Sequence, residues 1–219
     1  MQTTTLVRWS APLFAIGAIF FAMFIIISNG EFTGAELGLS MRHHAAHVSH
    51  FWSALSFMFG IIGFYVAHRE TSGVFGFVAF LFMMSANALF IGTGVITAFV
   101  WRTISANAPQ LVAANGAFFD PPLAVIFLAT VGFSVGMILL GVVAIRARLL
   151  PRGGAIMLIV GALMLLLPPQ PFGAVPYFVL DIGAVIFALG AIWLSMGLWR
   201  VGSAAQSIGA ATPSVAAAQ

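Results

Sequence analysis

The segment SMRHHAAHVSH, residues 40–50, runs directly into the apolar segment FWSALSFMFGIIGFYV, residues 51–66. Ser40 is of a residue type that often caps the start of a helix, and a helix from there would continue to about His68. At about 1.5 Å per residue, such a helix crosses a hydrocarbon core of about 30 Å and extends roughly two turns beyond it. The sequence therefore predicts a membrane-spanning helix whose protruding end is rich in histidine.

Three histidines share one face of this predicted helix. His43, His47 and His50 are spaced i, i+4 and i+7, whereas His44 lies about 100° away from them at 3.6 residues per turn. Imidazole nitrogens on successive turns of a helix can bind the same metal ion. This stripe is the main candidate for a functional site.

The composition of the chain identifies the solvent in which it folds. Of its 219 residues, 62% are hydrophobic and only 6% are charged, whereas a soluble domain carries roughly a quarter charged residues. Backbone polar groups inside a bilayer must be satisfied within the chain, which favours helices. We therefore predict an all-α integral membrane protein with the lipid bilayer as its partner.

The apolar segments predict a bundle of six transmembrane helices with short loops, in one domain over residues 1–200. Residues 201–219 are rich in alanine, serine and glycine and are predicted to be a disordered tail. Asp120, followed by two prolines, is typical of a helix start, and the segment 102–119 before it is predicted to be a surface or interfacial loop with room for one short helix between Pro109 and Gly116. The six spans are predicted at about 9–29, 48–68, 74–101, 120–146, 152–168 and 176–199.

The arginines predict the orientation of the bundle. All eight basic side chains are arginine, and cytoplasmic loops usually carry the excess of positive charge. With both termini in the cytoplasm, Arg42 and Arg102 face outward, and the membrane is predicted to be the plasma membrane. Because the arginines are dispersed, they form no basic cluster for nucleic acid. The arginines that face the cytoplasm are Arg8, Arg69, Arg146, Arg148, Arg152 and Arg200.

Metal binding is the leading functional prediction. The chain has no cysteine, so thiolate and iron–sulfur sites are excluded and a divalent metal ion would be bound mainly by imidazole and carboxylate. In the predicted orientation, carboxylates lie at the same outer end of the bundle as the histidine stripe. The predicted metal ligands are His43, His47, His50, Asp120 and Asp181.

A haem or chlorin pigment is the second candidate ligand. His47 or His50 would then be its single axial ligand, or the site would be shared across a dimer. A haem held by two histidines from two helices of one chain is excluded, because every histidine lies on or just beyond one predicted helix.

Other functions remain open at this point. No metalloprotease, nucleophile-elbow or phosphate-loop motif occurs, which argues against an enzyme. Asp181 and Asn87 lie within predicted spans, where they would suit a small proton or solute transporter. The chain could instead be a structural subunit of a larger membrane complex or form a homo-oligomer. Histidines at a membrane boundary can also sense protons or pH, or serve only to satisfy helix and loop hydrogen bonds.

Overall fold

The computed structural model describes residues 3–28, 38–112, 122–167 and 175–211. These residues are almost entirely helical and contain no β-strand, so the predicted all-α class is confirmed. The elements, in chain order, are α1 (Thr3–Ser28), α3 (Met41–Val95), a π-helix (Ile96–Val100), α4 (Trp101–Asn107), a 3-10 helix (Pro109–Leu111), α5 (Pro122–Ala147), α6 (Arg152–Leu165) and α7 (Tyr177–Ala211).

Four of the described helical segments are long and apolar enough to cross a membrane. This finding supports a membrane protein, but it does not confirm the predicted count of six spans. The fifth, α6, has 14 residues, or about 21 Å of helix, which is shorter than a hydrocarbon core of about 30 Å. The four candidate spans are Thr4–Ser28, Met41–Asn107, Leu128–Ala147 and Tyr177–Ala204.

The long helix α3 folds back on itself at Gly73. The backbone of Gly73 has φ 54° and ψ −147°, a non-helical conformation that glycine adopts readily because it has no Cβ. Residues 41–72 form the first arm of α3 and residues 74–95 form its second arm. The arms lie side by side, because the Asn87 side-chain nitrogen donates to the carbonyl of Ala54 at 2.9 Å. The bend falls within the connection predicted between the second and third spans.

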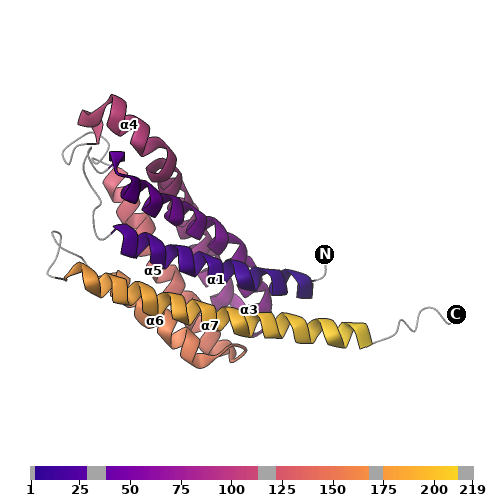
Figure 1. Ribbon diagram of the computed structural model, residues 1–219. Helices are drawn as coiled ribbons and strands as arrows, with labels where there is room; N and C mark the ends of the chain where they lie inside the picture. Colours follow the sequence, from indigo (N-terminus) through magenta and orange to yellow (C-terminus); the bar gives the residue numbers. More distant parts are fainter. Residues whose placement is uncertain (1–2, 29–37, 113–121, 168–174, 212–219) are drawn as a thin grey trace.

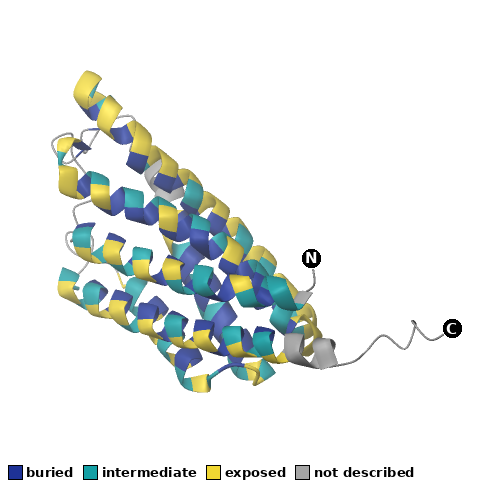
Figure 2. Ribbon diagram, turned by 45° about the vertical axis from the view of Figure 1, so that its right-hand side comes forward, coloured by how far each residue is buried: buried dark blue, intermediate teal, exposed yellow. Residues whose placement is uncertain are grey.

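The helices form a closed bundle around one core (Figure 1). α1 packs between α3 and α7, α6 packs against α7, and α5 packs against both α6 and α3. Residues that face the interior are buried, and many of those on the outside are exposed (Figure 2). Large apolar side chains such as Leu81, Phe99 and Met196 are among the exposed ones, as expected for a surface that meets lipid.

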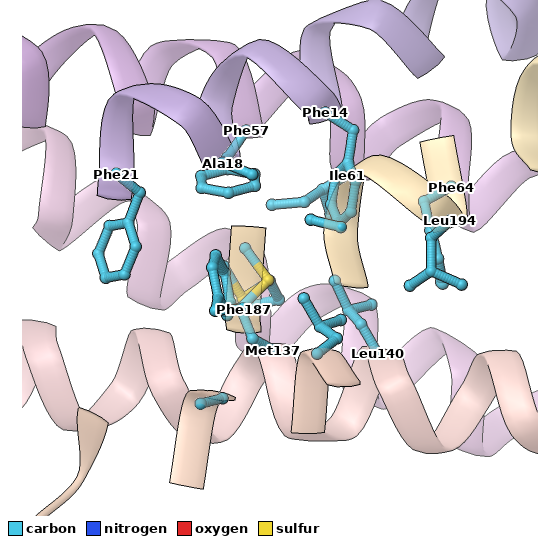
Figure 3. Close-up of a cluster of buried hydrophobic side chains, with 14 of the residues drawn as sticks. Phe14, Ala18, Phe21, Phe57, Ile61, Phe64, Met137, Leu140, Phe187 and Leu194 are labelled. Atoms are coloured by element: carbon cyan, nitrogen blue, oxygen red, sulfur yellow. The ribbon is translucent and has the colours of Figure 1, made fainter. Parts of the chain in front are cut away.

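Phenylalanines from α1, α3, α5 and α7 meet at the centre of the bundle, and Figure 3 labels three of them, Phe21, Phe57 and Phe187. The ring centroid of Phe21 on α1 lies 5.1 Å from those of Phe133 on α5 and Phe187 on α7. Phe57, on the first arm of α3, lies 5.5 Å from Phe133. These four rings are the phenylalanine core, and they fill the interior between the two ends of the bundle.

Glycines bring α6 and α7 into backbone contact. A Cβ atom on Gly161 would lie 2.5 Å from the backbone nitrogen of Phe187, and a Cβ on Gly190 would lie 2.5 Å from that of Leu158. Small residues at such positions let two membrane helices approach closely. Gly161 and Gly190 therefore allow the close approach of α6 and α7.

Two helices extend further than predicted. The third predicted span continues through the π-helix into α4, so residues 102–107 are helical where a surface loop was predicted. α7 continues to Ala211, so residues 201–211 of the predicted disordered tail are helical as well. α5 begins at Pro122, whereas Asp120, its predicted N-cap, lies outside the described residues.

Several of the arginines that are predicted to face the cytoplasm lie at the end of the bundle where α3 bends. The Arg8 guanidinium lies 4.5 Å from the centroid of the Trp199 ring on α7, next to Arg200. The Arg146 guanidinium lies 4.9 Å from the centroid of the Phe75 ring, just after the bend. We call this the arginine end.

The other two arginines lie at the opposite end, where α3 begins. Arg42 donates from Nε to the carbonyl of Ile27 at 2.7 Å, and Arg102 donates from Nη1 to the sulfur of Met41 at 3.1 Å. We call this the histidine end. The predicted division of the arginines between two ends thus agrees with these contacts.

Candidate functional site

The three striped histidines share one face of α3, as their spacing predicts, and in the structure this face is directed toward the interior of the bundle. His43, His47 and His50 retain only 4%, 5% and 5% of their exposed surface, whereas His44 is partly exposed. Ser40 occupies the N-cap position of α3, and its carbonyl accepts a hydrogen bond from the His44 N–H at 3.1 Å. The first turns of α3 therefore position the stripe toward the bundle and not toward lipid.

Neighbouring imidazole rings of the stripe are close to one another. The ring centroids of His43 and His47 are 4.2 Å apart, and those of His47 and His50 are 6.1 Å apart. A metal ion bound at 2.0–2.1 Å from a ring nitrogen lies about 3 Å from that ring's centroid, so two rings that share an ion have centroids at most about 6 Å apart. The His43–His47 pair is well inside this limit, and the His47–His50 pair is at it.

Three ring nitrogens of His47 and His50 have no hydrogen-bond partner in the described part of the chain. Nδ1 of His47 and both ring nitrogens of His50 are buried and make no hydrogen bond there. A buried polar atom without a partner costs about 1–3 kcal/mol. These atoms on neighbouring turns are therefore available to an ion, a small ligand or ordered water.

Aromatic side chains from other elements enclose the histidine rings. Phe24 of α1 stacks on His50 with ring centroids 4.6 Å apart, and Phe90 of the second arm meets the same ring at 4.0 Å. Trp101, the first residue of α4, lies 6.1 Å from the His43 ring. The site therefore consists of imidazoles inside an aromatic shell.

The sequence alone did not identify these three aromatic residues as part of the site. The chain contains 22 phenylalanines and five tryptophans, and ordinary filling of membrane helices explains most of them. The position of Trp101 also depends on the π-helix before it, which has no signal in the apolar periodicity.

The phenylalanine core closes the site on its inner side. Phe57 lies two turns beyond His50 on α3, where it packs against Phe133 and Phe187. The fifth histidine, His68, is also fully buried, but it lies beyond this core toward the arginine end, where its Nδ1 is 2.7 Å from the carbonyl of Phe64. Among the described residues, the phenylalanine core thus separates the histidine cluster from His68 and the arginine end.

The structure does not join the predicted carboxylates to the histidines. Asp181 is on the first turns of α7, which packs against α1 and α6, and it makes no ion pair or hydrogen bond with a described residue. Asp120 lies outside the described residues. Among the residues that are described, no group of three or more histidine, aspartate or glutamate side chains is arranged to hold a metal ion. The ligand roles of both carboxylates stay predictions.

The surroundings of His50 fit a haem or chlorin poorly. A flat macrocycle needs a cavity beside the coordinating nitrogen, whereas Phe24 and Phe90 pack directly against the His50 ring. A single ion beside the His43–His47 pair needs far less space. The geometry of the described residues therefore favours an ion over a pigment.

Comparisons of the chain with protein-family models, curated proteins and solved structures find no match. Helical membrane bundles support many unrelated functions, so the site has to carry the functional argument. Fold and site together define a helical membrane protein with a buried histidine cluster at one end.

Proposed function

We propose that the chain binds a transition-metal ion between His43 and His47, at the histidine end of the bundle, with His50 as an adjacent third imidazole. The observation that carries the proposal is the pair of buried rings on successive turns, with centroids 4.2 Å apart. Imidazole suits zinc, copper, iron and nickel ions, whereas magnesium and calcium prefer oxygen ligands. The proposed ion is therefore zinc or a neighbouring late transition metal.

The two imidazoles supply half of a tetrahedral set of ligands. Water or a small anion that enters from the histidine end would supply the remaining ligands. The unpartnered nitrogens of His47 and His50 would accept or donate hydrogen bonds to such molecules. In this arrangement His50 positions the other ligands of the ion without having to bind the ion itself.

Binding is favoured over transport by the position of the phenylalanine core. A transported proton or solute needs a path between both ends, and the rings of Phe21, Phe57 and Phe133 pack together between the histidine cluster and His68. Asn87, which the transporter hypothesis used, donates to the carbonyl of Ala54 and so links the two arms of α3. Interhelical bonding of this kind is typical of polar residues in membrane bundles.

The proposal is tested by the metal content of the purified protein. We expect about one zinc or copper ion per chain after dialysis against the metal salt, with no retention of Mg²⁺. The absorption spectrum of the same sample should show no haem or chlorin band. Absence of every transition metal would contradict the proposal, and a strong pigment band would replace it with the haem or chlorin alternative.

We further propose that both arms of α3 and the short α6 cross the membrane, which gives six spans with the arginine end in the cytoplasm of a cell bounded by the plasma membrane. The support is the distribution of arginine contacts between the two ends. Reporter fusions at Gly73 and at Asn107 should therefore report opposite sides of the membrane. Both reporters on the same side would contradict the six-span arrangement.

Membership of a larger membrane complex, or of a homo-oligomer, stays an alternative prediction. Co-purification in mild detergent distinguishes it from a single metal-binding chain. A metal-free protein that purifies with a stoichiometric partner would favour the structural-subunit alternative.

A further inference from the structure

The helix changes its hydrogen-bond spacing just before Trp101. Ile96–Val100 form a π-helix, and the N–H of Trp101 donates to the carbonyl of Ile96, five residues earlier instead of four. One additional residue is thereby accommodated, and each residue of an α-helix accounts for about 100° of rotation. Trp101 consequently lies about 100° from the face that it would occupy in an uninterrupted α-helix.

The face that Trp101 occupies is directed toward the histidine stripe. Trp101 is 2% exposed and its ring lies 6.1 Å from that of His43, whereas the preceding residues Phe99 and Val100 are 53% and 41% exposed. His43 is the striped histidine nearest the start of α3, so a ligand from the histidine end reaches it first. The Trp101 indole therefore lies beside the approach to the site.

Gly38 and Ser105 complete the contacts around this indole. A Cβ on Gly38 would lie 2.5 Å from Cδ1 of Trp101 and would overlap Oγ of Ser105, so the backbone approaches this closely only because Gly38 has no side chain. Ser105 is 3% exposed, and its hydroxyl makes no hydrogen bond to a described residue. The indole is therefore packed between the glycine backbone and the histidine stripe.

The short helix α4 has a hydrophobic cluster of its own. Trp101, Ile104 and Val112 pack together, separately from the main core of the bundle. α4 extends beyond the other helices at this end (Figure 1), and among the described elements it packs mainly on the π-helix and the 3-10 helix that flank it. A segment with few packing partners opens at a lower free energy than the bundle itself.

From these contacts we infer that Trp101 controls access to the histidine site, that α4 is the cover that carries it, and that the π-helix sets its orientation. The inference rests on the proposed function, because that function names the ion whose access is controlled. The packing of Trp101 beside His43 is independent of it and is a feature of the fold. Trp101 is thus a positioning and access residue and does not bind the ion.

The test measures how fast a small reagent reaches each histidine. Diethyl pyrocarbonate modifies neutral imidazole. The folded protein is exposed to the reagent for set times, and mass spectrometry then gives a modification rate for each histidine. Trp101→Ala and Trp101→Leu should raise the rates at His43 and His47 at least about tenfold, which corresponds to a barrier lower by about 1.4 kcal/mol. Trp101→Phe should stay near wild type. The matched control is Trp52→Ala, because Trp52 lies on α3, the helix that carries the histidines, and is 46% exposed.

Unchanged rates in both Trp101→Ala and Trp101→Leu would overturn the inference. An equal rise at His68, which lies beyond the phenylalanine core, would also overturn it, because that result means general loosening of the bundle. A parallel Cu²⁺ titration keeps the two proposals separate. Faster modification in the variants without Cu²⁺ binding would support the cover and contradict the proposed metal site. Cu²⁺ binding with unchanged modification rates would support the metal site and contradict the cover.

Discussion

Gly161→Leu is expected to cause the largest loss of stability of any single substitution considered for this chain. A Cβ at this position would lie 2.5 Å from the backbone nitrogen and 2.6 Å from the Cα of Phe187. Backbone atoms of α7 cannot rotate away as a side chain can, so α6 and α7 would have to separate. Overpacking in a well-packed interior typically costs about 1–3 kcal/mol, and we expect the upper part of that range or more.

The matched control for this substitution is Gly92→Leu. A Cβ on Gly92 meets no atom within 4 Å, so the added side chain extends into open space. Both variants change glycine to leucine in a helix, and only their surroundings differ. Thermal or detergent unfolding should show a large downward shift for Gly161→Leu and little change for Gly92→Leu. Similar shifts in both variants would contradict the close packing of α6 on α7.

His47→Ala is expected to have the largest effect on ligand binding. His47 lies between His43 and His50, with ring centroids 4.2 and 6.1 Å from theirs. Loss of a residue that only orients a ligand commonly lowers metal affinity 10–100-fold, so loss of a ligand itself should lower it by at least about 100-fold. Equilibrium dialysis with Zn²⁺ or Cu²⁺ measures the change directly.

His44→Ala provides the control for this second prediction. His44 is in the same helical turn but lies off the stripe and is partly exposed, so its loss should leave the affinity within about threefold of wild type, a difference of less than 1 kcal/mol. Unfolding midpoints of both variants separate loss of a ligand from loss of fold. Equal weakening by both substitutions would favour histidines that serve only the structure.

The sequence predicted the features that follow from composition and short periodicities. The low content of charge implied helices in lipid, and the i, i+4, i+7 spacing predicted that His43, His47 and His50 share one helix face. Gly73 falls in the predicted connection and is the point at which α3 bends. Each of these inferences depends on residues that are near one another in the chain.

The features that the sequence did not predict depend on contacts between distant segments. The roles of Phe24 and Phe90 follow from the packing of α1 and the second arm of α3 on His50. The inward position of Trp101 follows from a π-turn, because an uninterrupted α-helix places it on another face. α7 continues to Ala211 because weakly apolar small residues are compatible with helix as well as with disorder.

The contacts of Asp181 could not be predicted from its depth in the membrane alone. Its predicted place near the outer end of the bundle made it a candidate metal ligand beside the histidines, whereas in the structure it is partly exposed and makes no ion pair with a described residue. The described site therefore consists of imidazoles and aromatic rings. This composition favours ions that bind nitrogen over those that require carboxylate oxygen.

The most direct test of the central claim is to count the nitrogen ligands of bound Cu²⁺ by pulsed electron paramagnetic resonance. A metal site at the His43–His47 pair predicts coupling to imidazole nitrogens of two histidines in wild-type protein, the same signal in His44→Ala, and loss of one imidazole in His43→Ala or His47→Ala. Cu²⁺ that shows no imidazole coupling, or a signal that persists unchanged in both of the last two variants, would contradict a metal site at the His43–His47 pair.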